Sequence, residues 1–166
     1  MKLFIVLTVV LLLNASALAE GLPRGSKVAF LGLGFVDMST EGAFNGERDD
    51  ETRRLALLEQ LVVNRFRNEG MILVDIAPVA DKLDSIANPG NCYGCDVRMA
   101  RALGADFALV GAVHKISNLI ISMNLFLRDA GTGKVLYARA VDVRTNTDRS
   151  WSRGMNYILK TAFFKE

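Results

Sequence analysis

Apolar residues fall in short blocks along the chain, and three of these blocks predict buried strands. The blocks are nearly continuous in apolar character, too short for typical helices and rich in residues that favour strands. They cover residues 27–35, 71–75 and 107–116.

A fourth segment, residues 119–128, alternates between apolar and polar positions and predicts a strand that covers a core with one face. Successive side chains of a strand point to opposite faces, so every second residue shares a face. The residues expected on the buried face are Leu119, Ile121, Met123, Leu125 and Leu127. Ser117 and Asn118 are expected to form the hairpin turn before this strand, and residues 129–133 form a turn that leads to a strand over 135–143.

Helical spacing of apolar residues predicts two amphipathic helices. The stripe of the first helix is Leu55, Leu58, Leu61, Val62 and Phe66, and that of the second is Trp151, Met155, Ile158, Leu159 and Ala162. Asp49 or Asp50 is expected to cap the first helix and Gly70 to end it. Between the two, a short helix is expected to start at Pro78, and residues 92–103 resume a helical pattern.

The predicted elements follow one another in the order β-α-β-α-α-β-β-β-α. Residues 38–49 are polar and are expected to form a loop, and residues 88–91 form a turn. Helices early and a strand meander late imply a mixed sheet with helices packed against it. We therefore predict an α/β (α+β) fold with a single mixed sheet of about five strands. No repeat or linker divides the chain, so residues 20–166 are expected to form one domain.

Residues 1–19 have the pattern of a cleavable signal peptide. Lys2 supplies a positive charge, residues 3–13 are apolar, and Ala17 and Ala19 are the small residues that a signal peptidase reads. The apolar run is shorter than the roughly 20 residues that a membrane-spanning helix requires. The sequence therefore predicts an exported protein, and an uncleaved membrane anchor is the alternative.

Charge and hydropathy argue against several classes of protein. The formal net charge of the chain is only +2, and the sequence contains no basic stripe of the kind that an electrostatic nucleic-acid binder requires. No second apolar segment is long enough to cross a membrane, so no span is expected in the mature form. The sequence indicates neither a cofactor nor a metal site.

Cys92-Tyr93-Gly94-Cys95 is the sharpest motif in the chain. Cysteines at this spacing can close a disulfide, exchange thiols or hold half of a metal site. Export favours a structural disulfide, because the space outside the cytoplasm is oxidising. Thiol exchange stays open, with Cys92 as the nucleophile and Cys95 as the resolving thiol, because a helix N-terminus lowers the pKa of a thiol. A closed zinc site needs four ligands, and His114 is the only other soft ligand.

Other residues that could carry chemistry are scattered. His114 lies in a predicted strand, where a lone histidine is more often structural than catalytic. Gly32 and Gly34 also lie in a predicted strand, where glycines permit close packing more often than they form a phosphate loop. Four aspartates near predicted strand ends are expected to cap or terminate them: Asp37, Asp75, Asp106 and Asp129. We therefore predict no catalytic residues.

The polar segment 146–151 precedes the last predicted helix and has two interpretations. Thr147, Asp148 or Ser150 can cap that helix. The alternative is a partner-binding loop that an aromatic residue anchors. The candidate partner-binding residues are Asn146, Asp148 and Trp151.

Five segments carry a family resemblance: 91–95, 103–106, 109–111, 113–120 and 146–151. They resemble a family of uncharacterised exported bacterial proteins that is known only as a domain of unknown function. The resemblance implies a bacterial periplasmic protein and brings no known activity. It also implies a link to quinoprotein alcohol oxidation.

Three further motifs concern the fold. They are Phe-x-Asp-x-Ser over residues 35–39, Gly-Ala-Asp-x-x-Leu-Val-Gly over 104–111 and Asp-x-x-Thr-Gly-x-Val over 129–135. In these motifs the chain is similar to the amino-terminal domain of TolB and to the periplasmic domain of the curli secretion channel protein. Those are docking and assembly domains, so the resemblance implies a binding module.

These observations predict a non-catalytic periplasmic accessory module that binds another periplasmic protein. The prediction depends on the lack of a recognisable catalytic constellation together with the docking-domain resemblance. A periplasmic thiol-disulfide redox protein that uses Cys92 and Cys95 is the alternative. A third hypothesis is a small-ligand binder that uses the loop over residues 38–49.

Overall fold

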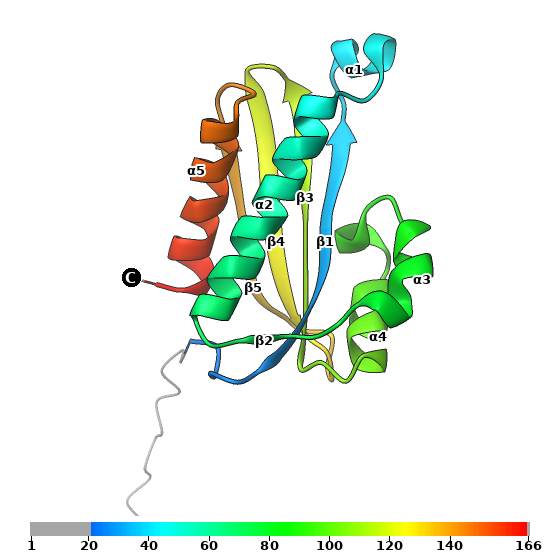
Figure 1. Ribbon diagram of the computed structural model, residues 1–166, viewed down its shortest axis with the longest axis vertical. Helices are drawn as coiled ribbons and strands as arrows, with labels where there is room; N and C mark the ends of the chain where they lie inside the picture. Colours follow the sequence, from blue (N-terminus) through cyan, green and yellow to red (C-terminus); the bar gives the residue numbers. More distant parts are fainter. Residues whose placement is uncertain (1–20, 166) are drawn as a thin grey trace, which may run out of the picture.

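The computed structural model describes residues 21–165, which place helices on both faces of one sheet (Figure 1). The predicted signal peptide, residues 1–19, lies outside the described residues. The strands are β1 (Lys27–Asp37), β2 (Ile72–Leu73), β3 (Phe107–Ser117), β4 (Ile120–Asp129) and β5 (Val135–Val143). The helices are α1 (Thr40–Asn45), α2 (Asp49–Asn68), α3 (Ala80–Asp84), α4 (Cys95–Ala102) and α5 (Asp148–Ile158), with 3-10 turns η1 (Ala77–Val79) and η2 (Pro89–Asn91) and a π-helical end η3 (Leu159–Phe163).

The sheet is mixed, and its five strands lie in the order β2-β1-β3-β4-β5. β1 runs parallel to both of its neighbours, whereas β3, β4 and β5 form an antiparallel meander. The predicted fold class and the predicted order of elements are confirmed. The short helix α1 is additional and lies in the segment predicted to be a loop. It forms because the Ser39 hydroxyl accepts a hydrogen bond from the Gly42 N–H and caps the first turn.

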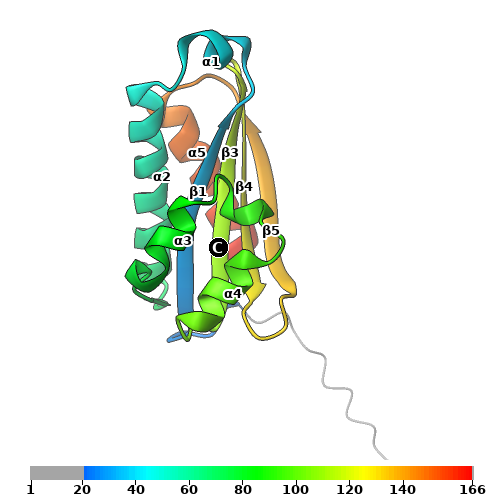
Figure 2. The ribbon, with the colours of Figure 1, turned by 90° about the vertical axis from the view of Figure 1, so that its right-hand side faces the viewer.

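The first face of the sheet is covered by α2 and α5, which bury large apolar side chains against it (Figure 2). Both predicted stripes contribute, with Phe66 from α2 and Trp151 from α5 among the fully buried residues. The alternation along β4 places its apolar positions beneath them: Ile121, Met123, Leu125 and Leu127. Helix α5 can approach the sheet closely because a Cβ at Gly154 would lie only 2.6 Å from a methyl carbon of Val143.

The second face is covered by α3, α4 and the loop around η2 (Figure 2). Its core consists of smaller side chains, mainly Ala29, Leu31, Cys95, Met99, Ala100, Ala108, Val110 and Ala130. This layer lies over β1 and β3, and most of β5 stays exposed. Among the described residues, β5 is also an edge strand.

Several strand ends differ from the sequence prediction. β2 consists of Ile72 and Leu73 alone, because the chain turns away into η1 where Asp75 accepts a hydrogen bond from the Ala77 N–H. Leu119 does not belong to the buried face of β4. It lies exposed in the β3–β4 turn, which is formed by Asn118 and Leu119 because β3 continues to Ser117.

Helix starts also differ in detail. The N-cap of α2 is Arg48, and the predicted caps Asp49 and Asp50 lie in the first turn, where negative charge favours a helix N-terminus. Of the three residues that could cap the last helix, Thr147 does so, and its hydroxyl accepts from the Ser150 N–H at 3.3 Å.

Candidate functional site

The predicted disulfide is present and closes the short loop between η2 and α4. Cys92 follows η2, and Cys95 is the first residue of α4, with the two Cα atoms 5.4 Å apart. Cys95 is buried in the small-residue core, and Cys92 packs at its margin. Helix α4 therefore begins later than predicted, and the cysteine at its N-terminus is Cys95 rather than Cys92.

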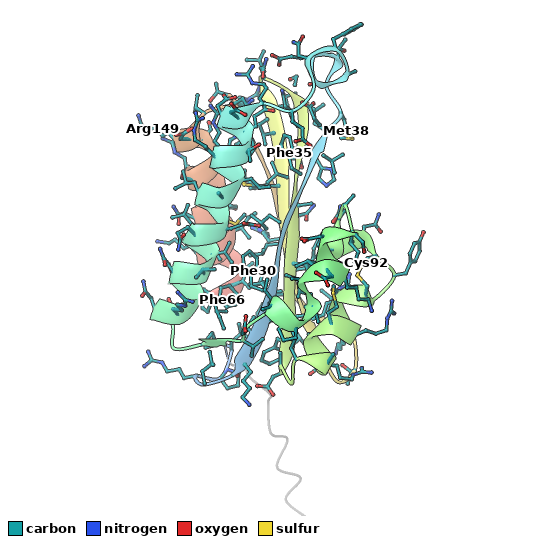
Figure 3. The ribbon with its side chains drawn as sticks, turned by 45° about the vertical axis from the view of Figure 1, so that its right-hand side comes forward. Phe30, Phe35, Met38, Phe66, Cys92 and Arg149 are labelled. Atoms are coloured by element: carbon teal, nitrogen blue, oxygen red, sulfur yellow. A yellow bond between two sulfur atoms is a disulfide. The ribbon has the colours of Figure 1, made fainter. Side chains whose placement is uncertain are left out.

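The same loop presents an aromatic ring to solvent (Cys92 is labelled in Figure 3). Tyr93 is 95% exposed and has a φ of 53°, in the left-handed region that residues with a side chain rarely adopt. The Arg98 guanidinium donates to the Tyr93 carbonyl oxygen at 3.1 Å. The most accessible group of the motif is thus a phenol, while the sulfur-bearing residues lie in or beside the core.

A second cluster lies at the apical end of the sheet, where β1 and β3 finish beside α1 (the upper end in Figure 1). Lys115 of β3 is fully buried there, and three carboxylates surround its ammonium group. Its Nζ lies 2.7 Å from Glu51 Oε1, 3.1 Å from Asp37 Oδ2 and 3.3 Å from Glu41 Oε2. We call these four residues the apical network. A buried charge requires partners of this kind, because burial without them is strongly unfavourable.

Two amides join the apical network to distant loops. The Asn118 side chain, in the β3–β4 turn, donates to Glu41 Oε2 at 2.6 Å. The Asn146 side chain, in the β5–α5 loop, donates to Glu51 Oε1 at 2.5 Å. The network therefore ties β1, α1, α2, β3, the β3–β4 turn and the β5–α5 loop into one unit.

The electrostatics of the apical network favour its charged forms. Burial alone would raise the pKa of Asp37, but hydrogen bonds from the Ser39 side chain and backbone and from Lys115 hold it below its usual value. Burial alone would lower the pKa of Lys115, but the carboxylates of Glu51, Asp37 and Glu41 hold it above its usual value. General acid–base catalysis needs a pKa close to the working pH. Both shifts lead away from neutrality, so the geometry fits a fixed ion cluster better than a proton-transfer site.

The three residues predicted to bind a partner occupy different environments. Asn146 is partly buried and bonds to the apical network, and the side chain of Asp148 is largely exposed and pairs with Arg54 at 2.8 Å. Trp151 is fully buried and packs against Phe35, with ring centroids 6.0 Å apart. A partner could therefore contact Asp148, whereas Trp151 supports the loop from inside the core.

Apolar side chains are exposed around the apical network. Phe44 of α1 is 84% exposed, Leu119 of the β3–β4 turn 66% and Met38, after β1, 57%. Ile116 and Ile120 at the adjoining ends of β3 and β4 are exposed as well. We call these five residues the apical patch. Such a group marks an interaction surface more often than isolated exposed apolar residues do.

The sequence interpretation missed the apical network and the apical patch, although one signal of the network was available. Lys115 shares the strand face of Leu109 and Val113, both of which are buried. A lysine at a core position of an apolar strand indicates buried carboxylate partners. The exposed Phe44 gave no comparable signal, because its exposure depends on a short helix that the sequence did not predict.

The remaining candidates have structural roles. Each of the four aspartates near strand ends accepts a local or neighbouring main-chain N–H, as expected: Asp37 from Ser39, Asp75 from Ala77, Asp106 from Lys27 and Asp129 from Thr132. His114 lies in β3 between Val36 and Ser122 of the flanking strands.

Among residues 21–165, there is no group of three or more His, Cys, Asp or Glu side chains that could hold a metal ion. None of the helices in this part of the chain combines the length and apolar character needed to cross a membrane.

Comparison with protein families gives one match. The family DUF3280, described as "Protein of unknown function (DUF2380)", matches residues 26–163. This agrees with the expected membership in a domain family of unknown function. No curated protein matches the chain.

Solved structures share the fold at low sequence identity. The LpoB C-terminal domain from Salmonella enterica has a TM-score of 0.55 and 16% identity, with 76% of this chain and 88% of that chain covered. The PelC dodecamer from Paraburkholderia phytofirmans has a TM-score of 0.51 and 16% identity, with 84% and 90% covered. TolB from Acinetobacter baumannii has a TM-score of 0.43 and 13% identity, with 85% and 30% covered. The LpoB and PelC structures establish the shared fold alone.

Proposed function

The chain belongs to the DUF3280 family of proteins of unknown function, and we propose that it is a non-catalytic module that binds another protein through its apical patch. The observation that carries the proposal is the exposure of Phe44, Leu119 and Met38 at one end of the sheet. Large aromatic and aliphatic side chains of this kind are typical anchors of protein interfaces.

The apical network supports this proposal because it holds the segments that carry the patch. The Met38 N–H donates to the Lys115 carbonyl oxygen at 2.9 Å, and Asn118 links the β3–β4 turn to α1 through Glu41. A surface that is held in place before binding loses little conformational entropy when the partner arrives. A cluster of buried charges is thus well suited to position apolar anchors.

The partner and its location are part of the same proposal. The predicted signal peptide and the family resemblance favour a periplasmic protein that binds another periplasmic protein. The family resemblance also favours a partner from quinoprotein alcohol oxidation. PelC, which shares the fold, forms a dodecamer, so a second copy of this chain is the competing occupant of the patch.

Replacing the anchors tests the proposal. The double variant Phe44→Ser/Leu119→Ser removes the two most exposed apolar side chains of the patch without touching the apical network. Ile72→Ser is the matched control, because Ile72 is an exposed apolar residue in β2, outside the patch. Each protein is immobilised, incubated with native periplasm, and the bound proteins are identified. Binding to the purified quinoprotein alcohol dehydrogenase of the same organism is then measured by calorimetry.

We expect a partner that binds the unmodified protein and the Ile72→Ser control and is lost from the double variant. Loss of anchors at the centre of an interface weakens binding by about 2 kcal/mol or more, which is about 30-fold. Retention of every bound protein by the double variant would contradict the proposal. Light scattering that shows a defined oligomer, disrupted by the same variant, would replace the partner with a second copy.

One observation supports the alternative, a thiol-disulfide redox function. Cys95 lies at the N-terminus of α4, where the helix dipole stabilises a thiolate. The burial of Cys95 favours a structural disulfide. The reduction potential separates the two functions.

A further inference from the structure

The outer edge of β1 is largely unpaired. β2 pairs only with Lys27 and Val28, and the last main-chain bond on this side runs from the Val74 N–H to the Val28 carbonyl oxygen at 3.0 Å. No other described strand lies along this edge, because β1 has only β2 and β3 as neighbours in the sheet. Most of β1 therefore offers main-chain groups to a further strand.

A bulge and a carboxylate mark the middle of this edge. The register between β1 and β3 shifts between Phe30 and Leu33, and Gly32 has a φ of 86°. Beyond the bulge, the Leu33 N–H points away from β3 and donates to Glu59 Oε1 of α2 at 2.9 Å. Since strand residues alternate, Phe35 and Asp37 present their main chains to the same side. Glu59 thus occupies the place that a carbonyl oxygen of an added strand would take.

A groove of about 630 Å³ follows this edge. Its floor is residues 30–35 of β1, one wall is α2 and the other is the segment around α3. Figure 1 shows β1 between α2 and α3, and Figure 3 labels Phe30 and Phe35 along the strand. The apolar lining includes Val63, Ile76, Leu83 and Ile86.

The charge of the groove has one sign. Glu59 and Asp84 are its only ionisable lining residues, and both are acidic. Among residues 21–165, neither forms an ion pair. Burial raises the pKa of Glu59, although its hydrogen bond from the Leu33 N–H opposes the effect. A partly buried carboxylate without a counter-ion is unfavourable unless a cation is supplied from outside.

We propose that this groove binds an extended segment of a partner protein, which adds a strand to the open edge of β1 and places a lysine or arginine side chain against Glu59. Strand addition supplies main-chain hydrogen bonds, and pockets for alternate side chains supply specificity. The acidic groove selects a basic side chain at the position opposite Leu33, with apolar neighbours two residues away on either side. This site is separate from the apical patch and does not depend on its function.

The experiment uses a random twelve-residue peptide library displayed on phage and selected on the purified protein. Ala56→Arg blocks the groove, because Ala56 is an exposed residue of α2 that lines it. Asn64→Arg is the matched control, because it adds the same charge at an exposed position of α2 outside the lining. Glu59→Gln keeps an acceptor for the Leu33 N–H and removes the charge. The best peptides are synthesised, and their binding and amide shifts are measured by NMR.

We expect the selected peptides to carry a basic residue at one fixed position. The Ala56→Arg variant should not bind them, whereas the Asn64→Arg variant should. In the unmodified protein, peptide binding should shift the amide signals of residues 30–37. On Glu59→Gln the preference for lysine over glutamine at that position should fall by about tenfold, equivalent to about 1.4 kcal/mol. No enrichment, equal binding to Ala56→Arg, or no basic preference would overturn the proposal. Peptides lost on Phe44→Ser/Leu119→Ser instead would assign binding to the apical patch and would also overturn it.

Discussion

The two faces of the sheet are covered by side chains of different size. The α2 and α5 face buries Trp151, Phe66 and Met155, whereas the α3 and α4 face buries mainly alanines, with a disulfide at its margin. Burial of apolar area stabilises a fold in proportion to the area removed from water. The first face should therefore account for most of the stability.

The second face shows what an incomplete layer leaves available. Its helices are short and lie over β1 and β3, so β5 stays exposed and the edge of β1 borders a groove. Tyr93 also projects from this side of the sheet on the disulfide loop. The groove and the exposed Tyr93 are thus found where the packing is least extensive. The following four predictions test this difference between the two faces.

The largest effect is expected at Trp151. Trp151→Ala should lower the free energy of unfolding by about 3–5 kcal/mol, because the ring is fully buried and contacts Phe35. Urea denaturation followed by circular dichroism measures the change. Asn156→Ala, on the exposed side of the same helix, should stay within about 0.5 kcal/mol. A loss under about 1 kcal/mol at Trp151 would mean that this face does not dominate stability.

Replacing Lys115 should lower the free energy of unfolding by as much as Trp151→Ala or slightly less. Lys115→Met should cost about 3 kcal/mol, because it leaves the carboxylates of Glu51 and Asp37 without their buried cation. The double variant Lys115→Met/Glu51→Gln should recover part of the loss, since it removes the most buried uncompensated charge. The effects of Lys115→Met and Glu51→Gln would simply add in the double variant if the two residues were not coupled. Such additivity would contradict the prediction.

The disulfide should contribute about 2 kcal/mol, because it closes a loop of only about four residues in the unfolded chain. The variant Cys92→Ser/Cys95→Ser should therefore fold, with a lower midpoint in urea, and keep its partner. A redox titration should give a reduction potential below about −300 mV, as is typical of structural disulfides. A potential of about −120 to −200 mV, or a thiol with a pKa well below about 8.5, would favour the redox function.

The smallest change in the free energy of unfolding is expected for Glu59→Gln, which should stabilise the protein at pH 7, whereas the other variants destabilise it. Burial raises the pKa of the Glu59 carboxyl group on folding. The folded protein therefore loses stability as the pH rises from the unfolded pKa of this group, about 4.3, through its folded pKa. Glu59→Gln should therefore match the unmodified protein below about pH 4 and be slightly more stable at pH 7. Denaturation at both pH values measures the difference. Lower stability of the variant at pH 7 would make Glu59 a structural residue of the bulge.

The strand meander and the long helices were predictable because their patterns are local. Alternation along β4 identified Ile121, Met123, Leu125 and Leu127, and all four are buried. The same alternation failed at Leu119, because the position of the turn depends on where β3 ends. Patterns along a chain define faces well, and they define ends poorly because ends depend on neighbouring elements.

The candidate sites were less predictable because they combine residues from distant parts of the chain. Glu51 and Asn146 are 95 residues apart, and nothing in either local sequence indicates their contact. The groove depends on β2 being short, which the apolar run over residues 71–75 did not reveal. The family resemblance supported the fold, but it did not indicate either surface.

The parallel pairing of β1 with β3 has a consequence for biosynthesis. Lys27 and Asp106, which are hydrogen-bonded at the start of these strands, are 79 residues apart. At roughly 5–20 residues per second, the ribosome releases the partner strand about 4–16 s after β1. The antiparallel meander can assemble as soon as it emerges, but the apolar first strand has to wait for it. We expect the nascent chain to require a holding chaperone during this interval, and β1 to join the sheet only after β3, with β2, which pairs only with β1, joining together with it or later.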